Sequence, residues 1–141
     1  MDKLYIGIDP GVKTGFAVWD PKNKTFQKIA TMSIVEAILT ACELEEKLKN
    51  KSMHFFIEDA RQCKFPGSHG AQFMQGVGSV KRDCTIWQDL CEDMSWKYEL
   101  INPMRHKYKK MSADDFKALT GYDNRTSSHA RDAAMLVWGM G

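Results

Sequence analysis

The sequence IGIDPGVKTG, residues 6–15, joins a short apolar run to an aspartate and then to a turn punctuated by glycine. The apolar residues predict a buried strand over residues 4–9 that ends at Asp9, with a turn at Pro10 and Gly11. Burying an unpaired carboxylate costs several kcal/mol, so some other group must meet the charge of Asp9.

The pattern along the rest of the chain predicts an α/β fold. Five strands are expected, at residues 4–9, 14–20, 26–31, 54–59 and 98–101. Four helices are expected. The first follows a capping box at Ser33 and Glu36, and the second covers about 71–95, with Gly76, Gly78 and Asp83 weakening its middle. The third runs from a cap at Ser112 to Thr120, and the fourth from a cap at Ser128 to about Trp138. The first three strands form an antiparallel meander, and strand–helix alternation follows, which indicates a sheet of mixed direction.

Acidic residues stand at the ends of three predicted elements. Asp9 ends the first strand, Glu58 ends the fourth, and His129 and Asp132 share one face of the first turn of the last helix. If the first and fourth strands are adjacent and parallel, Asp9 and Glu58 lie side by side and repel each other. A divalent cation resolves this conflict, and oxygen-rich sites suit Mg²⁺ or Mn²⁺.

Each of these residues has an ordinary structural interpretation when it is taken alone. Asp9 before Pro-Gly is typical of a turn, Glu58 of a surface strand end, and His129 and Asp132 of a helix terminus that complements the dipole. The combination is much less expected by chance, and it favours a metal site.

The composition and net charge of the chain limit which kinds of partner it can bind. The 141 residues carry a net charge of only +2, so attraction to nucleic acid must come from local clusters, of which RHKYKK at 105–110 is the densest. Apolar runs are too short to span a membrane and no secretory signal is present, which indicates a cytoplasmic protein. The four cysteines include no CxxC pair and are expected to be reduced, and Cys63 with His69 is a weak zinc signal.

The segments IGIDPGVKTGFAVWD, FFIED and HARDAA together resemble RuvC-like Holliday-junction resolvases of the ribonuclease H-like superfamily. The resemblance covers nearly the whole chain in the right order, and the compact length is similar to phage-type members, which would act in the host cytoplasm. It implies one nuclease domain over residues 1–141, with a five-stranded mixed sheet flanked by helices. It also implies two Mg²⁺ ions, replaceable by Mn²⁺, held by the catalytic residues Asp9, Glu58, His129 and Asp132.

The same resemblance implies hydrolysis of phosphodiester bonds in four-way or otherwise branched DNA. The segment NPMRHKYKK resembles the basic stretch that the family places near the scissile phosphate. Expected DNA contacts are Arg61, Lys64, Phe65, Arg105, Lys107, Lys109, Lys110 and Arg131. Family members often carry a junction-wedging aromatic shortly after the strand-four glutamate; here the first aromatic is Phe65, which could instead pack beside Pro66.

A homodimer is expected, because two matched cuts need two identical sites, and residues 71–80 are the candidate interface. Other nucleases of the superfamily, acting on flaps, forks or RNA, would carry the same acids. A catalytically inactive nucleic-acid-binding module is a further alternative, although such modules usually lose an acid. An actin-like or sugar-kinase ATPase is disfavoured, because the chain is short and shows no second phosphate loop.

Overall fold

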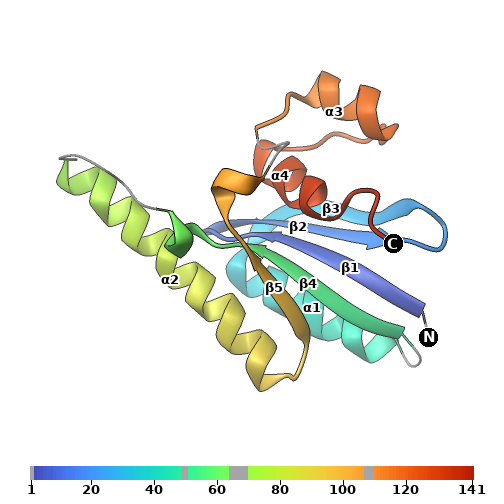
Figure 1. Ribbon diagram of the computed structural model, residues 1–141, viewed down its shortest axis with the longest axis horizontal. Coiled ribbons are helices and arrows are strands. Elements are labelled where there is room, and N and C mark those ends of the chain that lie inside the picture. Colours follow the sequence, from blue (N-terminus) through green and yellow to red (C-terminus); the bar gives the residue numbers. More distant parts are fainter. Residues whose placement is uncertain (1, 49–50, 64–69, 107–109) are drawn as a thin grey trace.

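The computed structural model describes residues 2–48, 51–63, 70–106 and 110–141. Its strands form one five-stranded sheet in the order β3-β2-β1-β4-β5 (Figure 1). The strand bounds are Asp2–Asp9 for β1, Lys13–Asp20 for β2, Thr25–Ser33 for β3, Lys51–Glu58 for β4 and Lys97–Ile101 for β5. The helix bounds are Ile34–Lys47 for α1, Ala71–Asp93 for α2, Ala113–Thr120 for α3 and Ser128–Val137 for α4, with short 3-10 turns η1 at Ala60–Gln62 and η2 at Pro103–Arg105.

The sheet is mixed, as predicted. β1 pairs antiparallel with β2, and β2 antiparallel with β3, which completes the expected meander. β4 runs parallel to β1 and β5 runs parallel to β4. Because Ile8 of β1 pairs with Ile57 of β4, the next residues, Asp9 and Glu58, reach the same edge of the sheet.

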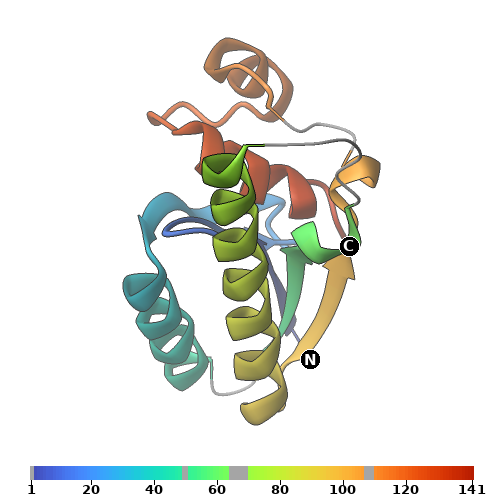
Figure 2. The same cartoon turned by 90° about the vertical axis from the view of Figure 1, so that its left-hand side faces the viewer.

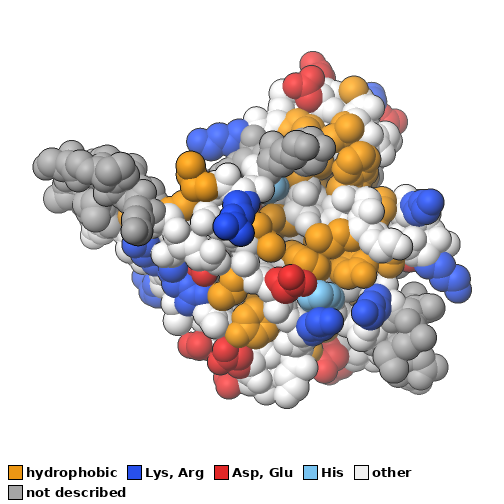
Figure 3. All heavy atoms as spheres, in the orientation of Figure 1, with side chains coloured by type: hydrophobic (Ala, Val, Ile, Leu, Met, Phe, Trp, Pro, Cys, Tyr) orange, Lys and Arg blue, Asp and Glu red, His pale blue; other side chains and the backbone are white. Residues whose placement is uncertain are grey.

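Helices cover both faces of the sheet (Figures 1 and 2). α1 and α2 lie on one face, where Trp87 and Ala41 pack against apolar side chains of β1, β2 and β4. α4 lies on the opposite face with α3 beyond it, and its buried residues pack against Ala17, Trp19 and Phe56. Hydrophobic side chains also reach the surface beside α4 on this second face (Figure 3).

Two glycines of the opening segment decide how closely α4 approaches the sheet. A Cβ atom on Gly7 would overlap the carbonyl oxygen of Ala133, and one on Gly15 would overlap the carbonyl oxygen of His129. The helix backbone therefore rests directly on the backbone of β1 and β2, where any larger residue would push it away. This contact brings the first turn of α4 next to the end of β1.

Helix boundaries differ from the prediction in two places. Ser127, not Ser128, is the N-cap of α4: its extended backbone lets Oγ accept from the amide of Ala130 at 3.2 Å. α2 runs unbroken through Gly76 and Gly78, and nothing lies within 4 Å of where a Cβ on either would be. Figure 1 shows the N-terminal end of α2 extending beyond the sheet. None of the described helices combines the length and apolar character needed to cross a membrane.

Candidate active site

Three carboxylates meet at the edge of the sheet where the parallel strands β1 and β4 end. Asp9 is the last residue of β1 and Glu58 the last residue of β4, and Asp132 lies in the first turns of α4. The side chains of Asp9 and Glu58 are 13% and 6% exposed, and Asp132 is also buried. The charges of Glu58 and Asp132 both act on Asp9, so the three acids lie near one another at this edge.

Each carboxylate has a specific hydrogen-bond partner. His129 Nδ1 lies 3.0 Å from Asp9 Oδ2, and His106 Nδ1 lies 3.0 Å from Glu58 Oε2. An ionised carboxylate only accepts, so in each pair Nδ1 carries the hydrogen. The third acid, Asp132, accepts at Oδ1 from the backbone amide of Lys110 at 2.8 Å.

The backbone of Lys110, whose amide donates to Asp132, has an unusual conformation. Its φ angle is +61°, in the left-handed region that non-glycine residues seldom adopt. The strain is tolerated where the surroundings fix the conformation, and such positions cluster at functional sites. Here the turn aims a backbone donor at the buried carboxylate of Asp132.

The acids influence one another electrostatically. Burial is the largest cause that raises the pKa of Asp9, and the negative charge of Glu58 is the next, with Asp132 contributing in the same direction. The hydrogen bond from His129 opposes these effects, and the pKa of Asp9 settles at about 6, against an ordinary value of 3.8. Asp9 thus lies in a pocket of negative charge that would favour either a proton or a cation.

Oxygen ligands of this kind are the ones that Mg²⁺ and Mn²⁺ prefer, so the three carboxylates are chemically suited to a divalent ion. As the side chains are placed, no three His, Cys, Asp or Glu residues in the described part of the chain form a ready-made metal cluster. Each acid is instead hydrogen-bonded within the protein, and a metal would have to compete for the oxygens held by His129, His106 and Lys110.

His106 is the residue of this site that the sequence patterns did not single out. It follows η2 directly, and its side chain is only 4% exposed. The ring nitrogen Nε2 is buried and has no hydrogen-bond partner. In the sequence, His106 is one residue of the basic run RHKYKK, and the positive charge of that run favours a surface role over a buried one.

The predicted DNA-contacting residues have different surroundings. Arg61 binds Asp59, with Nε 2.7 Å from Oδ1, and also reaches Gln88, with a distance of 2.6 Å to Oε1. Arg131 donates from Nε to the carbonyl oxygen of Met111 and from NH1 to that of Thr126.

Arg105 and Lys110 are exposed, and their segment contacts the carboxylates through His106, which bonds Glu58, and the Lys110 amide, which bonds Asp132. The remaining predicted contacts, Lys64, Phe65, Lys107 and Lys109, lie outside the described residues.

A mixed five-stranded sheet with this strand order, flanked by helices, is a ribonuclease H-like fold. Within that class the chain has a RuvC-like fold. It is similar to Thermus thermophilus RuvC in complex with a Holliday junction substrate, with a TM-score of 0.60 and 13% identity over 96% of this chain and 91% of that one.

A second structure of Thermus thermophilus RuvC matches with a TM-score of 0.52 and 15% identity, over 94% of this chain and 92% of that one. Comparison with protein-family models and with curated proteins gives no match. At these identities the likeness shows the fold.

Proposed function

We propose that the protein is a structure-selective endonuclease that hydrolyses phosphodiester bonds in branched DNA, with the four-way junction as its preferred substrate. The observation that carries the proposal is the meeting of Asp9, Glu58 and Asp132 at one edge of a RuvC-like sheet. The Holliday junction bound to one of the similar RuvC structures supports the choice of substrate.

Asp9, Glu58 and Asp132 would hold two divalent cations. His129 is a further candidate ligand. Mg²⁺ ions bound in this way would stabilise negative charge on the attacking and leaving oxygens of the phosphate. Mn²⁺ has the same ligand preference and is expected to substitute.

The two histidines take different parts in this proposal. His129 is half exposed, and because its Nδ1 donates to Asp9, its Nε2 is available for one of two roles, ligating a metal ion or accepting a proton from an attacking water. His106 is buried and contacts Glu58 rather than solvent, so it acts by holding that carboxylate in place.

Positive side chains beside the acids would meet the DNA backbone. Arg105 and Lys110 are exposed at the two ends of residues 105–110, and Lys107 and Lys109 lie between them in the sequence. Phosphate contacts of this type dominate the affinity of proteins for DNA and make it sensitive to salt.

A homodimer would supply two such sites for the two cuts that resolve a junction. The N-terminal part of α2 is the proposed interface, since it extends beyond the sheet in Figure 1 and includes the partly exposed Val77 and Val80. Sedimentation should give a dimer at micromolar concentration. A monomer that resolves junctions at the normal rate would contradict this part of the proposal.

The direct test compares cleavage of a four-way junction, a fork, a flap, a linear duplex and an RNA–DNA hybrid, each with Mg²⁺ or with EDTA. We expect the junction to be cut fastest and only with the metal, and Asp9→Asn to abolish the cut while the fold is retained. Full activity of Asp9→Asn would refute the assignment of the site. Faster cleavage of a flap, a fork or the RNA-containing duplex would keep the chemistry and change the substrate.

A further inference from the structure

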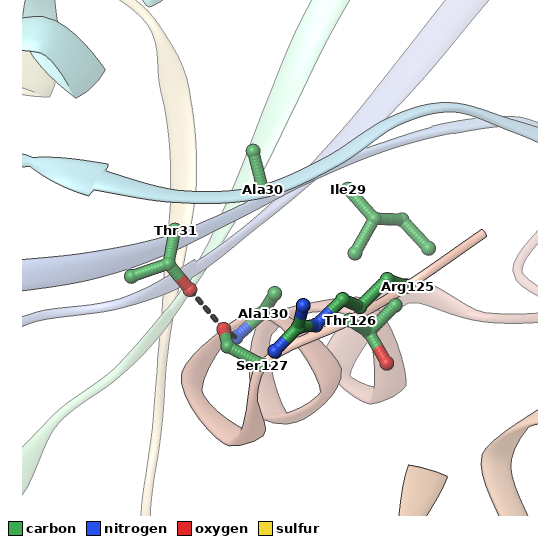
Figure 4. Close-up of a pocket in the computed structure, with 7 residues that line it drawn as sticks. All are labelled: Ile29, Ala30, Thr31, Arg125, Thr126, Ser127 and Ala130. Atoms are coloured by element: carbon green, nitrogen blue, oxygen red, sulfur yellow. Dashed lines mark hydrogen bonds between the residues drawn. The ribbon is translucent and has the colours of Figure 1, made fainter. Parts of the chain in front are cut away.

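A second polar pocket opens on the same face of the sheet, on the other side of the start of α4. Its volume is about 370 Å³, and it is lined by Ile29, Ala30, Thr31, Arg125, Thr126, Ser127 and Ala130 (Figure 4). Three of these residues belong to β3, and the others to α4 and the segment just before it. None of the residues assigned above to catalysis lines this pocket.

Strand register connects the pocket to the catalytic carboxylates. Asp9 of β1 pairs with Gly15 of β2, and Gly15 pairs with Thr31 of β3, so the three residues form one row across the sheet. Neighbouring strands are about 4.8 Å apart, which places the backbone of Thr31 roughly 10 Å from that of Asp9. The carbonyl oxygen of His129 lies above Gly15, in the middle of this row. The first turn of α4 therefore separates the two sites, and a DNA strand could pass over it from one to the other.

The lining offers hydrogen-bond donors and no acidic side chain. Thr126 Oγ1 accepts from Arg131 NH1 at 3.1 Å, which leaves the hydroxyl hydrogen of Thr126 to donate. The hydroxyls of Thr31 and Ser127 contact each other, as the dashed line in Figure 4 shows, and Ser127 also accepts from the amide of Ala130. Whichever of the two donates in their mutual contact, the other keeps a hydrogen for a ligand.

Arg125 adds a positive charge to these donors. Its side chain extends from the segment before α4 toward Ser127 and Ala130 in Figure 4. Among the described residues, no carboxylate or carbonyl oxygen accepts a hydrogen bond from the guanidinium of Arg125. A planar guanidinium beside free hydroxyl donors, with no carboxylate in the lining, is suited to an oxyanion and especially to a phosphate.

We propose that this pocket binds a backbone phosphate of the cleaved DNA strand, roughly two or three nucleotides from the scissile bond, with Arg125 as the principal contact. This inference rests on the proposed nuclease function and identifies a binding site for the substrate outside the catalytic carboxylates. The contact would fix the direction in which the strand crosses α4, and so the register of the scissile phosphate over Asp9.

The test begins with binding of a four-way junction in EDTA, where no cleavage occurs. We expect Arg125→Gln to weaken binding about tenfold and to reduce the slope of log affinity against log salt by about 1, as for the loss of one phosphate contact. Lys28→Gln is the matched control. Lys28 is exposed on the same strand, but it pairs with Val18 and lies on the opposite face of the sheet, so this variant should bind like the wild type.

A second measurement locates the contact on the DNA. Single phosphates around the cut are replaced by neutral methylphosphonates, one at a time, and each junction is tested with the wild type and with Arg125→Gln. We expect one position whose replacement weakens binding of the wild type but not of the variant, because the partner has already been removed.

Unchanged affinity and salt slope in Arg125→Gln, or methylphosphonate effects that are equal in both proteins at every position, would overturn the inference. If the wild type cuts junctions in the same preparation, only the pocket assignment is lost. If the wild type neither binds nor cuts any branched DNA, the proposed function fails as well.

Discussion

Nδ1 of His106 lies 3.0 Å from Oε2 of Glu58, and the two side chains are 4% and 6% exposed. The contact joins the end of β4 to the segment that follows β5 and η2. It therefore couples the orientation of a proposed metal-binding carboxylate to a residue that is distant in the sequence. Groups that orient a ligating carboxylate commonly matter almost as much as the ligand itself.

Replacing His106 should weaken the site without removing any acid. We expect His106→Leu to lower junction cleavage about 10- to 100-fold and to raise the Mg²⁺ concentration needed for half-maximal rate, because Oε2 of Glu58 loses the hydrogen bond from His106. His106→Asn should recover much of the loss, since its amide can donate from near the position of Nδ1. The measurement is the cleavage rate as a function of Mg²⁺ concentration. Variants that melt earlier but keep the wild-type Mg²⁺ midpoint would show that His106 serves only the stability of the fold.

The raised pKa of Asp9 predicts how the metal-free protein responds to pH. Burial and the charges of Glu58 and Asp132 raise this pKa from 3.8 to about 6, so the folded state binds more protons than the unfolded state between these values. Stability should fall as pH rises from about 4 to about 6, and the full penalty should persist at neutral pH. Asp9→Asn removes the charge and should stabilise the metal-free protein by about 1–3 kcal/mol at pH 7.5, with the loss of the His129 contact offsetting part of the gain.

Urea unfolding of both proteins in EDTA, at pH 4 and at pH 7.5, measures this effect. The gain from Asp9→Asn should nearly vanish at pH 4, where Asp9 is mostly protonated in the wild type. A gain of equal size at both pH values would show that repulsion among the acids is not its cause. Added Mg²⁺ should stabilise the wild type and have little effect on Asp9→Asn.

The backbone contact between α4 and β2 can be tested through Gly15. A methyl group there would overlap the carbonyl oxygen of His129, which cannot move without displacing the first turn of α4. Gly15→Ala should destabilise the protein by about 1–3 kcal/mol or more, and should reduce cleavage because His129 and Asp132 shift together. Gly76→Ala is the matched control: this position is open and helical, so the change should stabilise α2 by roughly 0.5–1 kcal/mol. Equal stability of Gly15→Ala and the wild type would contradict the close approach.

Local signals in the sequence were sufficient to predict most of the architecture. Apolar runs ending at Asp9 and Glu58 predicted two strands, which the structure shows to be parallel, and the capping residues Ser33 and Ser112 located the starts of α1 and α3. These features depend on neighbouring residues and on the spacing of apolar residues, both of which can be read from a single sequence. Ser127 and Ser128 are equally good capping residues, so only the backbone conformation could distinguish them.

Contacts between distant elements could not be predicted in the same way. Nothing local distinguishes His106 from its basic neighbours, because its burial depends on where β5 ends relative to β4. The pocket at Arg125 likewise depends on the register that brings Thr31 beside Ser127, and that register is a property of the assembled sheet. In α2 the local signal was misleading in the other direction. Gly76 and Gly78 weaken the helix locally, but packing of its C-terminal half keeps it unbroken.

Arg61 forms an ion pair with Asp59. This contact gives Arg61 a structural role, which can be tested against the DNA contact predicted for it. Burial of Asp59 would by itself raise its pKa, but the hydrogen bonds and charge of Arg61 lower the pKa below its ordinary value. The side chain of Asp59 is 4% exposed, so Arg61→Ala would leave a buried charge without its main partner. We expect this variant to lose about 1–3 kcal/mol of stability at pH 7, and less below pH 4, where Asp59 can take up a proton.

Lys117→Ala is the comparison for this effect, because Lys117 and Asp123 form an ion pair whose side chains are 63% and 79% exposed. Its loss should change stability little, since exposed pairs contribute little. Thermal unfolding and junction affinity are to be measured on the same samples. An Arg61→Ala protein as stable as the wild type but with weakened, less salt-dependent binding would assign Arg61 to the DNA. A destabilised protein whose affinity and salt slope stay at wild-type values below its unfolding temperature would assign it to the anchoring of η1 against α2.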